Sequence, residues 1–286
     1  MMELYEGWRC DSPCQHYLLL DGAVPEPIQA FYTHSPDVDW HPLYLHTEFE
    51  DLLSMSPMLI PVDEESPMLR WFLAGPENWQ HGMCVQTFAS HKTSVVHLQS
   101  ILKSVLYGYM DVFFRFHDPS ILDIMLPTLT DAEKSRLLGP IYSWNWIGPS
   151  MPYSWNRLTH PHADIQDVIS YGDVPNELQK KPFLFSDDTM RAYRAAKDKQ
   201  FIQKVRNYFL EKGVPFAEEG FEREAATAIA QGRQYGLTYE STLCIFMVFW
   251  FSVSPDFHRA TGIKDIFEKS EMPELEKIEL VCDEML

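Results

Sequence analysis

Short apolar runs alternate with amphipathic stretches through the first half of the chain. Six runs have the composition of β-strands: residues 17–20, 43–45, 58–62, 83–88, 111–117 and 141–147. Between the fourth and fifth runs, apolar side chains recur at helical spacing over residues 95–105. Strands that alternate with helices predict a mixed lobe in which helices cover a sheet.

Capping residues mark where two further helices of this half should begin. Thr47 and Glu50 have the spacing of a capping box. Ser66 precedes Pro67, and proline is favoured in the first helical turn. We therefore expect one helix after Thr47 and a second from Pro67.

The amino-acid composition of the sequence changes near residue 148. Glycine, proline and asparagine become frequent there, whereas the chain beyond residue 186 has a helical pattern throughout. The predicted fold class is α+β, with three parts: an N-terminal α/β lobe with a mixed sheet over residues 1–147, a Pro- and Gly-rich connector over residues 148–185, and an all-α lobe over residues 186–286.

Capping residues and glycines also set the helix boundaries of the second lobe. Ser186 is expected to cap a long helix that ends at Gly213, and Thr238 to cap another helix. Residues 243–251 of that helix are apolar on every side. Such a helix needs neighbours all round, so we expect it at the centre of the lobe.

The net charge of the chain indicates which classes of partner it attracts and which it repels. The chain has 23 Lys and Arg against 41 Asp and Glu, a formal net charge of −18. Between residues 1 and 91, Arg9 and Arg70 are the only fixed positive charges against 14 acidic residues. Such a surface repels phosphate backbones and anionic lipids, so we expect neither nucleic acid nor membrane insertion, whereas a cationic protein partner would be attracted.

Cysteine usage and the first residues favour the cytoplasm. The five cysteines are scattered and odd in number, which is typical of a reducing compartment. The N-terminus lacks the basic start and apolar run of a secretory signal.

Few residues carry the marks of catalysis. None of the 13 glycines lies two positions from another, and no Gly-x-Ser-x-Gly occurs, so dinucleotide-binding loops and a serine nucleophile elbow lack support. The best enzymatic candidate is the group His160, His162 and Asp164, because two imidazoles and a carboxylate suit zinc. A polar loop explains the same residues. We expect no catalytic, cofactor or metal site, and keep a metal-dependent hydrolase as an alternative.

The most informative segment is Phe-Phe-Arg-Phe-His-Asp-Pro at residues 113–119. If it is a strand, alternate side chains share a face, and Asp118 with Pro119 then begins a helix. Arg115 on a largely buried strand needs a carboxylate from Asp118 or Asp21, because an unpaired buried charge is strongly destabilising. Arg115 either supports the architecture or contacts a partner directly.

Motifs spread over residues 17–146 resemble a known family. They are Tyr-Leu-Leu-Leu-Asp-Gly-Ala (17–23), Pro-Leu-Tyr (42–44), Ser-Pro-Met-Leu-Ile (56–60), the helical stretch 97–102, Phe-Phe-Arg-Phe-His-Asp-Pro (113–119) and Leu-Gly-Pro-Ile (138–141). In this order they are similar to the bacterial type VI secretion effector adaptors, also called effector chaperones. The positions that carry the resemblance are Asp21, Gly22, Tyr44, Arg115, Phe116, Asp118, Pro119, Gly139 and Pro140.

The resemblance implies a non-enzymatic cytoplasmic adaptor of a Gram-negative bacterium. Such an adaptor binds a toxin effector and helps to load it onto the VgrG spike, alone or with a co-chaperone. The motif positions would then be structural or partner-binding. The second lobe is similar to the family only in style, which leaves the identity of the effector open. A structural component of the secretion apparatus is a further alternative.

Overall fold

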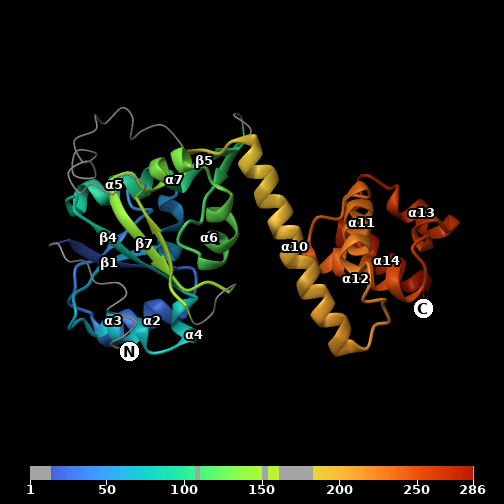
Figure 1. Ribbon diagram of the computed structural model, residues 1–286, viewed down its shortest axis with the longest axis horizontal. Coiled ribbons are helices and arrows are strands. Elements are labelled where there is room, and N and C mark those ends of the chain that lie inside the picture. The colour runs from blue at the N-terminus through green and yellow to red at the C-terminus, as the bar shows by residue number, and fades with distance from the viewer. Residues whose placement is uncertain (1–13, 107–109, 150–153, 161–182, 286) are drawn as a thin grey trace. The chain divides into compact units, whose positions relative to one another are not determined.

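The computed structural model describes residues 14–106, 110–149, 154–160 and 183–285 (Figure 1). The chain divides into two compact units, Met1–Tyr193 and Arg194–Leu286, and the division falls within helix α10 (Asp187–Lys212). Sheets lie in the first unit and helices make up the second, which confirms the α+β class.

A six-stranded antiparallel sheet forms the centre of the first unit. Its strand order is β2-β3-β1-β4-β7-β8. The strands are β1 (Gln15–Leu20), β2 (His41–Pro42), β3 (Met58–Pro61), β4 (Gly82–Thr87), β7 (Ile141–Trp146) and β8 (Asn156–Thr159). The predicted apolar runs at 17–20, 58–62, 83–88 and 141–147 are thus confirmed as strands. The strand predicted at 43–45 was wrong: β2 ends at Pro42, and the amide of Leu45 donates to the carbonyl of Pro42 in a turn.

Helices cover both faces of this sheet, as Figure 1 shows with α2 and α3 on one side and α5 and α7 on the other. Leu18 and Leu20 of β1 pack in one core cluster with α2 and α3, whereas Tyr17 and Leu19 pack in another with α5, α6 and α7. Because both faces are buried, β1 is an unbroken apolar run rather than an alternating one. The helices are α2 (Pro25–His34), α3 (Pro67–Leu73), α4 (Pro76–Trp79), α5 (His91–Leu102), α6 (Pro119–Met125), η2 (Leu126–Thr128) and α7 (Asp131–Leu138).

A small second sheet with order β6-β5-β9 is mixed. Strand β5 (Lys103–Leu106) pairs antiparallel with β6 (Met110–Phe113) and parallel with β9 (Phe183–Leu184). The strand expected over 111–117 was predicted too long, because β6 ends at Phe113. The amide of Asp118 donates to the carbonyl of Arg115 at 3.1 Å, and this turn sends the chain into α6.

The two predicted helix starts have different outcomes. The hydroxyl of Ser66 accepts from the amide of Leu69, so it caps α3 as expected. The helix expected after Thr47 is a 3₁₀ helix, η1 (Glu50–Met55), whose N-cap is Phe49 rather than Thr47. Since η1 buries none of its residues, no packing favours extending it into an amphipathic α-helix.

Two strands lie inside the predicted connector over 148–185. Strand β8 continues the large sheet beside β7, and β9 joins the small sheet beside β5. The turn-forming residues of this stretch therefore flank strands of the first unit. Residues 150–153 and 161–182 lie outside the described part of the chain.

Five α-helices and one 3₁₀ helix with a single apolar core make up the described part of the second unit. They are the continuation of α10, α11 (Phe221–Gln234), α12 (Glu240–Ser252), η3 (Phe257–Arg259), α13 (Thr261–Phe267) and α14 (Glu274–Met285). Gly213 follows α10 with a φ of +67°, as expected of a terminating glycine. Helix α12 contributes Leu243, Phe246 and Met247 to the core. Among the described helices, none combines the length and hydropathy that crossing a bilayer requires.

The cap of α12 comes from a distant residue. Thr238 was expected to supply it, but the N-cap is Tyr239, and the carboxylate of Glu274 on α14 accepts from the amides of Thr238 and Tyr239 at 2.7 and 3.1 Å. It also accepts from the hydroxyls of Thr238 and Thr242. Burial alone would raise the pKa of Glu274, but these four hydrogen bonds lower it to about 2.

Candidate functional site

The charged residues of the motifs meet where β1 ends. Asp21 directly follows β1, and Arg115 and Asp118 lie between β6 and α6. Arg115 Nη2 donates to Asp21 Oδ2 at 2.5 Å and lies 3.7 Å from Asp118 Oδ2. The expectation that Arg115 pairs with a carboxylate is confirmed, and both predicted carboxylates take part.

Asp21 uses both of its carboxylate oxygens within the protein. Its side chain is only 11% exposed, and Oδ1 accepts from the amide of Ala23 at 2.9 Å while Oδ2 accepts from Arg115. Its own amide donates to the carbonyl of His81 at 2.7 Å. Asp21 therefore ties the end of β1 to the segment before β4 and to the 113–119 motif.

His117 is buried next to this ion pair. Its side chain is 1% exposed, and its Nε2 is 3.8 Å from Asp21 Oδ1. Burial holds the pKa of His117 well below its ordinary value, although the carboxylate of Asp21 acts in the opposite direction. The ring is therefore neutral at pH 7, and its Nδ1 has no hydrogen-bond partner among the described residues.

Phe116 fixes the motif to the core of the first unit. It is fully buried and stacks on Trp144 of β7, with ring centroids 5.6 Å apart and planes 18° apart. Phe116 also makes an edge-to-face contact with His117, so the aromatic packing extends to the residue next to the ion pair.

Tyr44 lies between the Asp21–Arg115 ion pair and the aromatic rings of Phe49 and Phe113. Burial raises the pKa of Tyr44 to about 12, and the nearby carboxylate of Asp21 adds to this effect while Arg115 opposes it. The ring contacts those of Phe49 and Phe113, with centroids 5.9 and 5.7 Å away. Tyr44 is thus a buried spacer between the charged cluster and two aromatic side chains nearer to solvent.

Gly22 is required by a close approach of two backbone segments. A Cβ atom at this position would lie 2.0 Å from the carbonyl oxygen of Ser56. The hydroxyl of Ser56 in turn accepts from the amide of Tyr44 at 2.9 Å. The turn after β1 therefore packs against Ser56, which joins the two ends of the segment between Tyr44 and Ser56.

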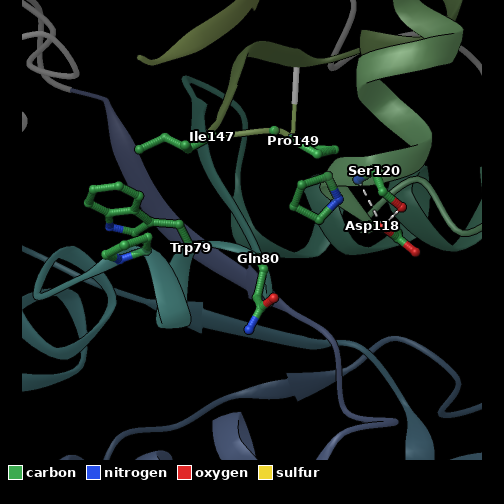
Figure 2. A pocket seen from close by; sticks show the side chains of 9 residues that line it. Trp79, Gln80, Asp118, Ser120, Ile147 and Pro149 are labelled. Carbon is green, nitrogen blue, oxygen red and sulfur yellow. Dashed lines mark hydrogen bonds between the residues drawn. The ribbon is translucent and has the colours of Figure 1, made fainter. Parts of the chain in front are cut away.

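Asp118 and Pro119 start α6 as the sequence predicted. Asp118 Oδ1 accepts from the amide and the hydroxyl of Ser120 at 2.9 and 2.6 Å, and Pro119 occupies the first turn (Figure 2). Because Asp118 serves as a helix cap, its carboxylate is occupied in the absence of any partner.

A pocket of about 380 Å³ lies beside this helix start. Figure 2 shows the labelled residues of its lining: Trp79, Gln80, Asp118, Ser120, Ile147 and Pro149. The lining is mainly apolar, and Asp118, its charged residue, is bound to Ser120. The pocket can take an apolar side chain more readily than a charged ligand.

Gly139 and Pro140 belong to a separate cluster around His97. Gly139 has a φ of +52°, and a Cβ there would lie 2.3 Å from His97 Cε1. His97 Nε2 donates to the carbonyl of Leu137 at 2.9 Å, and burial lowers the pKa of His97 to about 4, so the ring is neutral. The carbonyl of Pro140 accepts from Thr87 at 3.0 Å. This second cluster joins α5, α7 and the start of β7.

The metal alternative has only one of its three residues in the described part of the chain. His160 is buried, with its Nε2 3.5 Å from the hydroxyl of Ser135, whereas His162 and Asp164 lie outside the described residues. Within residues 14–106, 110–149, 154–160 and 183–285, no three His, Cys, Asp or Glu side chains are placed to share a metal ion.

The sequence did not predict one group of exposed apolar side chains. Leu52, Leu53 and Met55 of η1 are exposed. Phe49, directly before η1, contacts Phe113, and both rings are partly exposed. We call these five residues the η1 surface. A pair of leucines directly after Glu50 and Asp51, in a stretch without helical period, was the signal available in the sequence.

These features define a two-unit α+β protein with a partly buried charged cluster at one end of its main sheet. Residues 16–136 match the family model described as "Domain of unknown function (DUF4123)", and this family is associated with type VI secretion. The match includes the Asp21–Arg115 cluster and ends before Gly139. Searches of curated proteins and of solved structures found no match.

Proposed function

We propose that this chain is a non-enzymatic adaptor that binds a type VI toxin effector in the cytoplasm and helps to load it onto the VgrG spike. The observation that carries the proposal is the match of residues 16–136 to a domain associated with type VI secretion. The order of the motifs supports the same role.

The use of the motif residues inside the protein favours binding over catalysis. Asp21, Arg115 and Asp118 bind one another or cap a helix, and His117 is buried and neutral. These residues therefore stabilise the fold of the first unit and do not supply a reactive group. Partner contact would come from exposed apolar side chains next to them, because such side chains lose contact with water on binding.

Co-expression tests the proposal directly. The tagged chain is produced with the VgrG protein and the candidate toxins encoded near its gene, and the complexes are separated by size-exclusion chromatography and identified by mass spectrometry. We expect co-elution with one toxin, and a larger assembly when VgrG is added. A VgrG protein from an unrelated cluster serves as the control.

Two results would contradict the adaptor role. Elution of the chain apart from every toxin and from VgrG would remove the proposal. A stable complex with VgrG that forms without any toxin, and never includes one, would instead indicate a structural component of the apparatus.

A further inference from the structure

Helix η1 turns its large apolar side chains outward. Leu52, Leu53 and Met55 are 45%, 38% and 43% exposed, and η1 buries none of its residues. A surface helix usually packs its apolar side chains inward. A contiguous group of exposed apolar side chains on a folded protein marks a place where another molecule binds.

Hydrogen bonds fix the chain on both sides of η1. Besides the Tyr44 to Ser56 hydrogen bond, the side-chain amide of Gln99 on α5 donates to the carbonyls of Leu43 and Leu45 at 3.2 and 2.8 Å. The motif residue Gly22 lets Ser56 approach the end of β1. The apolar side chains of η1 are thus presented from a fixed support, which reduces the ordering that binding would require.

The exposed group continues onto the small sheet. The ring of Phe113, 40% exposed, lies 4.9 Å from that of Phe49, which directly precedes η1. Both rings rest on Tyr44. Phe113 ends β6, which is an edge strand of the described sheet. Aromatic and large aliphatic side chains of this kind are typical anchors of protein interfaces.

Acidic side chains border the η1 surface. Glu48, Glu50 and Asp111 are 54%, 52% and 63% exposed, and Asp51 is exposed as well. One lysine, Lys103, bridges Glu48 and Asp111 at 3.1 and 3.0 Å. Four carboxylates against one ammonium group give this border a negative charge, which favours a cationic occupant.

We propose that the η1 surface is the docking site for a segment of the toxin effector that carries Lys or Arg beside large apolar side chains. This inference rests on the proposed adaptor function and names the chemistry of its cargo. A second copy of this chain suits the surface less, because each copy has a net charge of −18.

Polar truncation of η1 tests the apolar part of the proposal. Dissociation constants for the toxin identified by co-expression are measured for the wild-type chain, for Leu52→Ser with Leu53→Ser, and for Tyr32→Ser. Tyr32 on α2 is 63% exposed and serves as the matched control. We expect the double variant to raise Kd about tenfold or more, and the control to change it less than about twofold. Since η1 buries nothing, circular dichroism of the double variant should match the wild type.

Salt and charge removal test the cationic part. The Kd of the wild-type chain should rise about tenfold between 0.1 and 0.4 M NaCl, because screening weakens attraction between exposed charges. Glu50→Gln with Asp51→Asn should weaken binding at low salt and flatten this dependence. Binding that ignores salt would overturn the cationic assignment.

The remaining outcomes separate the two proposals. If no toxin binds the wild-type chain, the adaptor function falls and this inference falls with it. If a toxin binds and the double serine variant binds equally well, the inference alone is overturned. A wild-type dimer in light scattering that the same variant dissociates would assign the surface to a second copy, and would also overturn the inference.

Discussion

The Asp21–Arg115 cluster and the η1 surface are neighbours with opposite chemistry. In the cluster, Asp21 is nearly buried and both of its oxygens accept hydrogen bonds from within the chain. On the η1 surface, Leu52 and Leu53 are exposed, and η1 buries none of its residues. Tyr44 lies between the two regions and contacts the aromatic rings of the second.

This contrast separates the residues that carry the family resemblance from those that we propose to contact a partner. Most motif positions lie in the cluster and its supports, and Gly139 and Pro140 lie in the separate cluster around His97. On the η1 surface only Phe113 belongs to a motif, and Phe49, Leu52, Leu53 and Met55 do not. A change in the cluster should therefore cost stability, whereas a change on the surface should cost binding alone.

The largest expected effect is that of Gly22→Ala. The new Cβ would meet the carbonyl oxygen of Ser56, a backbone atom that cannot rotate away. We expect a loss of about 3 kcal/mol in the free energy of unfolding, or failure to fold, measured by denaturation with urea. Gly262→Ala is the control, because a Cβ there has only ordinary contacts at 3.7 Å and beyond. Equal stability of the two variants would contradict the close approach.

The next effect is that of Arg115→Met, which leaves Asp21 Oδ2 without its charged donor. We expect a loss of about 2 kcal/mol, the scale of a hydrogen bond between charged groups. A double-mutant cycle with Asp21→Asn should show strong coupling between the two sites. A variant with wild-type stability that no longer binds toxin would instead show that Arg115 contacts the partner directly.

Mild acid should destabilise the first unit through its buried histidines. The pKa of His97 is about 4 in the folded protein, below the ordinary value of 6.5. The unfolded chain therefore binds the proton more readily, and the stabilising contribution present above pH 6.5 is lost as the pH falls towards 4. We expect a slope of about 1.4 kcal/mol per pH unit between pH 6 and pH 5 from His97. Urea denaturation of the His97→Gln variant should show a shallower slope than the wild type, and parallel slopes would refute this assignment.

The smallest effect on stability should come from the η1 surface. Leu52→Ser with Leu53→Ser should change the free energy of unfolding by less than about 0.5 kcal/mol, as is usual for exposed sites. Leu59→Ala in the buried strand β3 should cost about 3 kcal/mol and provides the comparison. A large loss in the serine variant would mean that η1 supports the core, and the contrast between the two regions would fail.

The sequence predicts those parts of the fold that depend on nearby residues. Strands such as β1 and β3 contain short apolar runs, and the α3 and α6 starts carry their own caps, Ser66 and Asp118. The pairing of Arg115 with a carboxylate was also predicted, although the buried strand on which that prediction depended was wrong: Arg115 follows β6 and its side chain is 42% exposed. The two sheets and the fully antiparallel pairing of the larger one depend on contacts between distant segments, which no local pattern contains.

Distant contacts account for the features that were predicted wrongly or missed. The strand over 111–117 has a suitable composition, but β6 ends at Phe113 because the chain turns towards α6. Thr238 looks like a cap in the sequence, yet a carboxylate 36 residues away caps α12. Exposure of Leu52 and Leu53 could not be foreseen either, since leucine pairs are buried in most surroundings.

The remote cap on α12 has a consequence for how the second unit forms. The amides of Thr238 and Tyr239, directly before α12, have Glu274 of α14 as their acceptor. While the chain is being synthesised, α12 is therefore complete before Glu274, which lies 36 residues beyond Thr238. We expect α12 to gain its full protection from hydrogen exchange only together with α14, as one cooperative step late in folding.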